Sequence, residues 1–344
     1  MTEPLKFAIV GCGVISPTHA RSIHELPDAC LTAVCDIVPE KAQVLAGVYP
    51  AEVYTDVEEM LRHADIDVVD VTTPSGTHAE VGIAAARAGK HVLVEKPMDI
   101  TLERADSLIA ACREMGVKLG VISQHRFDPA VMALKAVVEE GRLGRLNFGG
   151  SHTKWFRSQE YYDSGDWRGT WALDGGGALI NQSIHYVDLL QYVLGPVEEL
   201  SAYTATLAHT RIEVEDLAVA ALKFRSGALG LLEGSTSAYP GYCARLDVYG
   251  SEGSVIIEND QIIAWNLQSG ESCPVKDEVT GGFIGGSSSK DIWHYAHRSQ
   301  IAEMIAAIRE DRRPLVDGEE GRKPLEIVLA VYESARTGKP VRLA

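Results

Sequence analysis

One short stretch of this 344-residue chain combines a glycine-rich turn with three polar side chains at helical spacing. In GGGALINQSIHYVD, residues 175–188, Asn181, His185 and Asp188 stand at positions i, i+4 and i+7 and share one face of the expected helix. The residues between them are largely Ile, Tyr, Val and Leu. This face is therefore either a solvated surface or a site for chemistry. The three side chains could also coordinate a divalent ion, but no second cluster of His, Cys or Glu is evident, and we expect no metal site.

A second stretch has the residue types of a phosphate-binding turn. GCGVIS, residues 11–16, follows an apolar strand and precedes a helix. Gly11 and Gly13 would let the backbone approach a pyrophosphate, and the helix N-terminus would supply N–H donors. Ser16 stands where the usual fingerprint has its third glycine, so the alternative is an ordinary turn between a strand and a helix. Asp36 ends the next strand, where a carboxylate can bind both hydroxyls of an adenosine ribose, and this favours NAD over NADP.

Two further segments stand at the ends of apolar strands, at the sheet edge where open α/β sheets bind ligands. They are TTPSGTH, residues 72–78, and VEKP, residues 94–97. Near a nicotinamide cation and away from water, Lys96 would lose its proton more easily, which suits proton transfer. An ordinary surface pair of Glu95 and Lys96 is the alternative. Besides Gly11, Gly13 and Asp36, the residues expected at the cofactor are Val14, Ile15, Thr73, Pro74, His78, Glu95 and Lys96.

The elements that must position these residues begin with a repeated strand–helix pattern. Five short runs, rich in β-branched residues and nearly continuous in apolarity, are typical of strands covered on both faces. They are KFAIVG, LTAVCD, DVVDVTTP, HVLVEKP and VKLGVIS. Between them, Asp56 and Thr101 are expected to cap helices, and Gly116 to end the second of these. The pattern predicts an α/β Rossmann dinucleotide-binding domain over residues 1–123.

The pattern changes after QHRFDP, residues 124–129. One helical segment gives way to longer, alternating runs such as LAVAALKF, ALGLLEGSTSA and ARLDVYGSEGSVIIEN. These predict a mostly antiparallel sheet with a few helices, and hence an α+β domain over residues 124–344. His297 heads a late helical segment and is a further candidate for function, although a lone histidine is more often structural.

Composition limits the class of protein. The net charge of −16 disfavours binding to nucleic acids or to anionic membranes. No apolar run is long enough to span a bilayer, and no charged-then-apolar leader precedes Phe7, so we expect a cytoplasmic protein. The six cysteines are scattered without a CxxC pair and predict neither a zinc ribbon nor a disulfide framework.

The motifs together resemble those of one family. GCGVIS with Asp36, TTPSGTH, VEKP, QHRFDP, GGGALINQSIHYVD and GRKPLEIVLAVYESARTGKPVRL are similar, in type and order, to motifs of the glucose-fructose oxidoreductase / inositol dehydrogenase / rhizopine-catabolism (Gfo/Idh/MocA) family. The resemblance covers nearly the whole chain. It implies an N-terminal Rossmann domain and a C-terminal α+β domain with a large, mostly antiparallel open sheet. It also implies that the substrate lies between the two domains and that the sheet joins subunits into a homodimer or homotetramer.

The resemblance also implies catalytic roles for individual residues. The lysine of the E-K-P motif corresponds to Lys96, and the histidine of the glycine-rich helix corresponds to His185. His185 would exchange a proton with the substrate alcohol while Lys96 polarises it or relays the proton. Many relatives carry Asp where this chain has Asn181, which leaves the identity of the main acid/base open. Asp188 could orient His185 or serve local packing.

The segment from Trp155 to Trp171, just before the glycines, is rich in aromatic and basic residues and could set substrate specificity. Aromatic rings stack on sugar rings, and arginines donate to hydroxyls, carboxylates or phosphates. The alternative is an aromatic core or a subunit contact. The residues expected at the substrate are Arg126, Arg157, Trp167 and Arg168, with Asn181 and His185.

These expectations define an NAD-dependent dehydrogenase that oxidises a secondary hydroxyl of a pyranose, an anhydrosugar or an inositol. One alternative is a reductase of a keto-sugar or nucleotide-linked sugar in the same family. A second alternative is a non-catalytic NAD-binding regulator, because a fold does not determine function.

Overall fold

The computed structural model describes residues 3–275 and 294–343. The chain forms two compact units, and each is described by itself. The first comprises the described residues within 1–124 and 292–322, and the second those within 125–291 and 323–344. The described residues include no helix long and apolar enough to cross a membrane.

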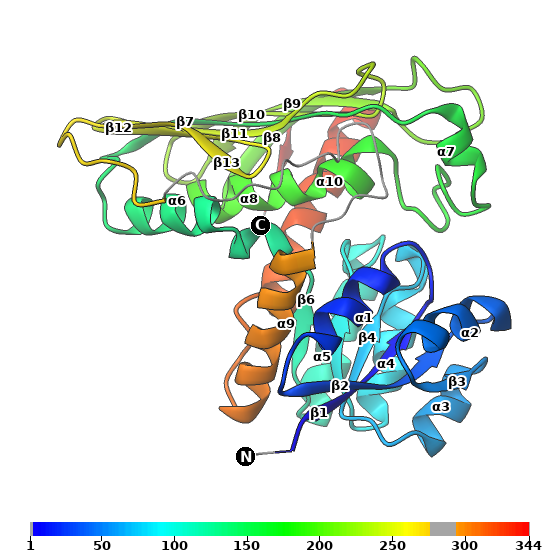
Figure 1. The fold of residues 1–344 in the computed structure, drawn as a ribbon. Helices are drawn as coiled ribbons and strands as arrows, with labels where there is room; N and C mark the ends of the chain where they lie inside the picture. The colour runs from blue at the N-terminus through cyan, green and yellow to red at the C-terminus, as the bar shows by residue number, and fades with distance from the viewer. Residues whose placement is uncertain (1–2, 276–293, 344) are drawn as a thin grey trace. The chain divides into compact units, whose positions relative to one another are not determined.

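The first unit is built on a six-stranded parallel sheet in the order β3-β2-β1-β4-β5-β6 (Figure 1). This is the strand order of a dinucleotide-binding fold, and it confirms the Rossmann prediction. Strand β4 is buried throughout, and β1 and β5 are buried except at their first residues, as their continuous apolar sequences predicted. The strands are β1 Leu5–Val10, β2 Ala29–Cys35, β3 Glu52–Tyr54, β4 Val68–Val71, β5 His91–Val94 and β6 Leu119–Val121.

Helices cover this sheet, and the local sequence indicated where α3 begins and where α5 begins and ends. Asp56 accepts a hydrogen bond from the Glu59 N–H at the start of α3, and Thr101 accepts one from the Arg104 N–H at the start of α5. Gly116 ends α5 in the left-handed conformation, at φ +68°. The helices are α1 Ser16–His24, α2 Pro39–Val48, α3 Val57–His63, α4 His78–Arg87, α5 Leu102–Met115 and α9 His294–Arg309, with the short 3-10 turn η1 Ser75–Thr77 before α4.

The core explains why a late segment of the chain belongs to the first unit. The sequence places one boundary near residue 123, whereas the structure adds residues from 292–322 to the N-terminal unit. Ile301 and Ile305 of α9 are buried in one cluster with Phe7, Ile23 and Leu93 of the strands and α1. The apolar face of α9 is therefore part of the Rossmann core, a long-range contact that local periodicity does not reveal.

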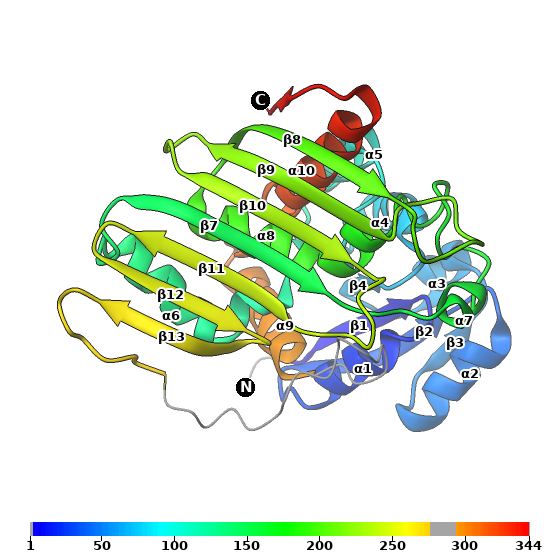
Figure 2. The same cartoon turned by 90° about the horizontal axis from the view of Figure 1, so that it is seen from above.

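The second unit is built on an eight-stranded sheet in the order β13-β12-β11-β7-β10-β9-β8-β14 (Figure 2). All neighbouring pairs are antiparallel except β7 and β10. This confirms the expected large, mostly antiparallel sheet. The strands are β7 Leu146–Lys154, β8 Val197–Ala205, β9 Leu217–Phe224, β10 Leu229–Ser235, β11 Ala244–Gly250, β12 Gly253–Glu258, β13 Gln261–Leu267 and β14 Val341–Arg342.

Helices lie against one face of this sheet, as Figure 1 shows for α6 and α8. Burial alternates along β9 and β10, so every second side chain faces those helices. The glycine-rich motif forms a π-helical turn, η3 Ala178–Ser183, which continues directly into α8. The remaining elements are η2 Gln124–Phe127, α6 Pro129–Glu139, α7 Gln159–Asp163, α8 Ile184–Leu194 and α10 Gly318–Thr337.

Candidate active site

The glycine loop and Asp36 form one hydrogen-bonded structure at the carboxyl end of β1 and β2. The Asp36 carboxylate accepts hydrogen bonds from the backbone N–H of Cys12 at 2.7 Å and of Val38 at 2.8 Å. Gly11 has φ +96°, and a Cβ there would lie 2.7 Å from the backbone of Thr72 and Thr73. Only glycine permits this close approach of the loop to the end of β4.

The same loop has an open side that fits a pyrophosphate. A Cβ on Gly13 would meet no atom within 4 Å, and Val14 is 58% exposed. No side chain caps the N-terminus of α1 at Ile15, and the Ser16 hydroxyl instead donates to the Gly13 carbonyl oxygen. An open glycine, an uncapped helix N-terminus and a nearby carboxylate are the features that bind a dinucleotide.

His78 joins the two other segments at this sheet edge. Its side chain is 1% exposed, and its ring nitrogens lie 2.8 Å from the carbonyl oxygens of Thr73 and Pro97. Burial lowers the pKa of His78, against the weaker opposing effect of these carbonyl groups. Thr73 and Pro74 are half-buried. His78 thus connects the loop after β4 with the loop that carries Lys96, which makes it a structural support of the expected cofactor site.

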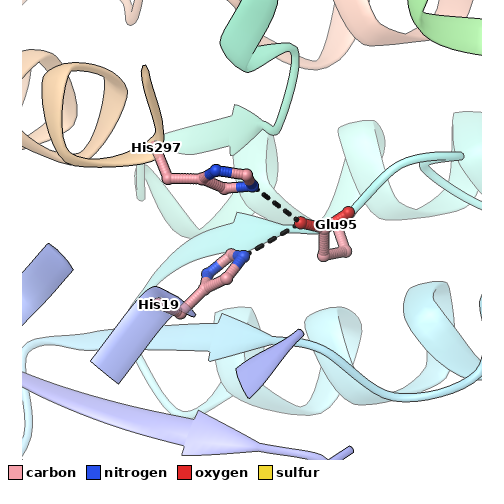
Figure 3. A group of neighbouring side chains, drawn as sticks. All are labelled: His19, Glu95 and His297. Carbon is pink, nitrogen blue, oxygen red and sulfur yellow. Dashed lines mark hydrogen bonds and ion pairs between the residues drawn. The ribbon is translucent and has the colours of Figure 1, made fainter. Parts of the chain in front are cut away.

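Glu95 is buried and paired with histidines, which differs from a surface pair with Lys96. One carboxylate oxygen lies 2.9 Å from Nε2 of His19 and 3.7 Å from Nε2 of His297 (Figure 3). The other oxygen accepts the backbone N–H of Lys96 at 3.0 Å. Burial alone would raise the pKa of Glu95, but the two histidines and Lys96 hold it well below its usual value.

Sequence reasoning missed two members of this cluster, His19 and Asp70. Nδ1 of His19 lies 2.7 Å from the Asp70 carboxylate, and both side chains are fully buried. Burial alone would lower the pKa of His19, but Asp70 and Glu95 raise it to about 10. A usable signal was present, because Asp70 is a charged residue inside the otherwise apolar strand VVDV.

Each polar residue of the glycine-rich motif in the second unit contacts a different partner. Asn181 lies in η3 and donates from Nδ2 to the Asp174 carboxylate at 2.6 Å. His185 is the second residue of α8, and its ring packs edge to face on the ring of His125 with centroids 5.1 Å apart. Asn181 therefore lies in a π-helical turn and His185 in the regular helix that follows it, where the sequence had predicted one continuous helix.

Asp188 and Arg126 form a buried pair. Nε and Nη2 of Arg126 donate to the two Asp188 oxygens at 2.7 and 2.5 Å, and the guanidinium stacks on the ring of Tyr192. Both side chains are at most 4% exposed. Of the two roles left open for Asp188, this contact supports packing. It also gives Arg126 a structural partner within the second unit.

His125 is a further residue that sequence reasoning did not select. Its Nδ1 lies 2.7 Å from the Asp128 carboxylate and 3.1 Å from that of Asp260. Burial alone would lower the pKa of His125, but the two carboxylates hold it well above its usual value. Asp260 reaches this position through a tight turn between β12 and β13, in which Asn259 and Asp260 both have positive φ. The ring that contacts His185 therefore belongs to a histidine that is paired with two carboxylates.

Two arginines gather on one tyrosine next to the motif. The guanidinium carbon of Arg168 lies 4.4 Å from the Tyr161 ring centre, and that of Arg157 lies 5.5 Å from it. Arg168 donates to the Tyr161 hydroxyl at 2.6 Å, and Gln182 of η3 donates to the same oxygen at 3.0 Å. Trp167 packs on Arg168 at 4.5 Å. The expected substrate residues Arg157, Trp167 and Arg168 therefore form one cationic, aromatic cluster attached to η3.

Within the described residues, two clusters bring at least three potential metal ligands together. They are His19, Glu95 and His297, and His125, Asp128 and Asp260. His19 and His125 already pair with carboxylates through the ring nitrogens that face the clusters. In the set considered from the sequence, Asn181 pairs with Asp174 and Asp188 pairs with Arg126.

Fold and site together define an oxidoreductase with an N-terminal dinucleotide-binding domain. Residues 5–123 match the family described as "Oxidoreductase family, NAD-binding Rossmann fold", and residues 131–256 match the "GFO/IDH/MocA C-terminal domain". The chain belongs to the GFO/IDH/MocA family of NAD-binding oxidoreductases.

Two of the relatives compared cover almost the whole chain, and a third covers three quarters of it. The WlbA dehydrogenase from Bordetella pertussis, solved with NADH and UDP-GlcNAcA, is 36% identical with a TM-score of 0.91, covering 100% of this chain and 99% of its own. The inositol 2-dehydrogenase of Rhizobium meliloti is 29% identical and covers 99% of both chains. The levoglucosan dehydrogenase of Pseudarthrobacter phenanthrenivorans is 27% identical and covers 75% of both.

We predict that Asp36→Asn changes the choice between cofactors. The amide keeps the size of the side chain but removes the charge that would repel a 2′-phosphate and one acceptor for the ribose hydroxyls. The ratio of the NADPH to the NADH dissociation constant, measured by fluorescence titration, should fall at least about tenfold. Asp56→Asn, at the cap of α3, is the matched control and should leave the ratio unchanged. An unchanged ratio in Asp36→Asn would show that this carboxylate does not select NAD.

Proposed function

We propose that this protein is an NAD-dependent dehydrogenase that oxidises a secondary ring hydroxyl of an acidic, nucleotide-linked sugar. The observation that carries the choice of substrate is the pair of guanidinium groups of Arg157 and Arg168 on Tyr161, tied to η3 through Gln182. Two adjacent cations next to the glycine-rich motif are suited to a carboxylate or a diphosphate. A neutral inositol needs no such charge.

The charge of Arg157 supports an anionic ligand. Arg157 is only 6% exposed, and burial lowers the pKa of its guanidinium while the neighbouring Arg168 acts in the same direction. A ligand anion would raise the pKa of Arg157 again, because its negative charge stabilises the guanidinium cation that burial and Arg168 destabilise. The relative that is 36% identical was solved with a sugar nucleotide, which supports the same substrate class.

The chemistry assigned to the chain is proton transfer. Bound NAD would accept the hydride from the carbinol carbon, so that the alcohol becomes a ketone. The imidazole of His185 accepts the hydroxyl proton, and the Lys96 ammonium polarises the same oxygen. Asn181, held by Asp174, hydrogen-bonds a substrate hydroxyl. Because hydride transfer is reversible, the same residues would serve reduction of the keto-sugar.

The experiment follows NADH formation by its near-ultraviolet absorbance with matched substrates. UDP-N-acetylglucosaminuronic acid and UDP-N-acetylglucosamine differ at one carboxylate, and myo-inositol and levoglucosan represent neutral substrates. We expect the acidic sugar nucleotide to give the highest kcat/KM, and Lys96→Ala to lower its kcat at least about 100-fold. Arg168→Gln should raise KM for the acidic sugar about tenfold or more, because it removes a charge-assisted contact, with a smaller effect on the neutral sugar nucleotide.

Arg211→Gln is the matched control for Arg168→Gln. Arg211 is an exposed arginine that pairs with Asp163 of α7, and its loss should leave KM unchanged. Faster turnover of inositol or levoglucosan than of either sugar nucleotide would contradict the proposed substrate. Absence of turnover in both directions, with NADH binding intact, would instead favour an NAD-binding regulator.

We also propose that the face of the eight-stranded sheet opposite the helices joins copies of the chain into a homodimer or homotetramer. This face carries exposed apolar side chains on β8, β9 and β10, namely Tyr203, Val219, Leu229 and Leu231. Exposed apolar patches of this kind commonly mark protein interfaces. Sedimentation velocity should find two or four chains per particle, and a single-chain particle would contradict the proposal.

A further inference from the structure

The first unit encloses a group of four titratable side chains that the proposed chemistry does not use. They come from four separate elements: His19 from α1, Asp70 from β4, Glu95 from the end of β5, and His297 from α9. Their side chains are at most 8% exposed. Figure 3 shows the two imidazoles converging on one oxygen of Glu95. Buried carboxylates persist only where positive charge or hydrogen-bond donors compensate them.

The geometry identifies His19 as that compensating charge. Nδ1 lies 2.7 Å from Asp70 and Nε2 lies 2.9 Å from Glu95, so both ring nitrogens face carboxylate oxygens. A neutral imidazole has only one N–H and would direct a lone pair at the second carboxylate. The doubly protonated ring donates to both. His297 is the other titratable side chain packed on His19, with ring centroids 5.1 Å apart.

A metal ion is the competing occupant, and the local contacts favour the proton. Nε2 of His19, an oxygen of Glu95 and Nε2 of His297 lie within 4.8 Å of one another, close enough to share an ion. An ion would have to displace the proton between His19 and Glu95, which are 2.9 Å apart. It would also have to reach side chains that are almost completely buried.

The position of Glu95 connects this charge to Lys96. Glu95 directly precedes Lys96, and its second oxygen accepts the Lys96 backbone N–H at 3.0 Å. Without His19, more of the compensation of the Glu95 charge would fall to the Lys96 ammonium, and Glu95 would compete with the substrate for it. His19 also lies on α1, the helix that begins at the glycine loop.

We propose that His19 is a positioning residue of the dehydrogenase reaction: an imidazolium that, anchored by Asp70, fixes the Glu95 carboxylate and thereby orients Lys96. This inference rests on the role of Lys96 in the proposed function. His19 touches neither substrate nor cofactor in this account. His19 acts on Lys96 through Glu95. Its contact with Glu95 also connects α1, the helix that follows the glycine loop, to the end of β5, where Lys96 lies.

The test compares His19→Gln with His24→Gln, a substitution of an exposed histidine on the same helix. Glutamine can donate to one carboxylate but carries no charge, so kcat for the substrate should fall at least about tenfold. KM for the sugar and the NADH dissociation constant should change less than about threefold, since neither ligand contacts His19. His24→Gln should match the wild type in all three quantities. In a Glu95→Gln background, adding His19→Gln should lower kcat no further, because both changes act through one carboxylate.

A neutral His19 would not produce the following pH dependence of stability. The pKa of His19 is raised to about 10 in the folded chain, against an ordinary value of 6.5. The stability from its charge is thus fully present below pH 6.5 and is lost as the pH rises through about 10. The melting temperature of the wild type should exceed that of His19→Gln most at or below pH 6.5, and the difference should shrink toward pH 10.

The possible outcomes distinguish a failure of the proposed function from a failure of the role proposed for His19. A wild-type protein that turns over no sugar in either direction overturns the proposed function and this inference with it. An active wild type whose His19→Gln variant keeps its kcat overturns this inference alone. One equivalent of zinc or manganese, bound by the wild type and lost in His19→Gln, would replace the imidazolium with a metal and overturn it as well.

Discussion

The ion pair between Glu95 and the buried imidazole of His19 is the constraint on which the first unit depends. A carboxylate at the end of a central strand is costly unless a donor compensates it, and His19 supplies that donor at 2.9 Å. The same imidazole reaches Asp70 on the neighbouring strand, so one side chain contacts carboxylates from two strands. The glycine loop, the helix behind it and the residue before Lys96 are consequently held as one structure.

The second unit uses the same physical device around its glycine-rich motif. His125 is held between Asp128 and Asp260, and it supports the ring of His185. Asp174 holds Asn181, while Tyr161 collects hydrogen bonds and cations next to η3. In both units the residues assigned to chemistry depend on charged partners from other elements, which are buried around Glu95 and half-buried around His125. Such partners hold reacting groups in place more firmly than solvent-exposed loops would.

The sequence was sufficient for features that depend on neighbouring residues. Continuous apolar runs predicted the parallel strands, and Asp56, Thr101 and Gly116 marked helix ends by chemistry that acts within one turn. The glycine loop and Asp36 were recognisable because a dinucleotide site needs them at characteristic spacing.

The features that escaped prediction depend on contacts between distant residues. The partner of Asp188 is Arg126, 62 residues away, and the partner of His19 is Asp70, 51 residues away. The packing of α9 into the first unit joins segments almost 300 residues apart, such as Phe7 and Ile301. No local pattern encodes such pairs, although Asp70 within an apolar strand did indicate that a buried partner was required.

Measuring the protonation state of His19 in the folded chain tests the role of this buried charge most directly. Nitrogen-15 NMR of the labelled protein, with His19→Gln used to assign the signal, reports on both ring nitrogens. Both nitrogens are expected to carry protons from pH 6 to pH 9, because the pKa of His19 is raised to about 10 by Asp70 and Glu95. A ring that is neutral at pH 8, with one unprotonated nitrogen, would contradict the central role given to this buried charge.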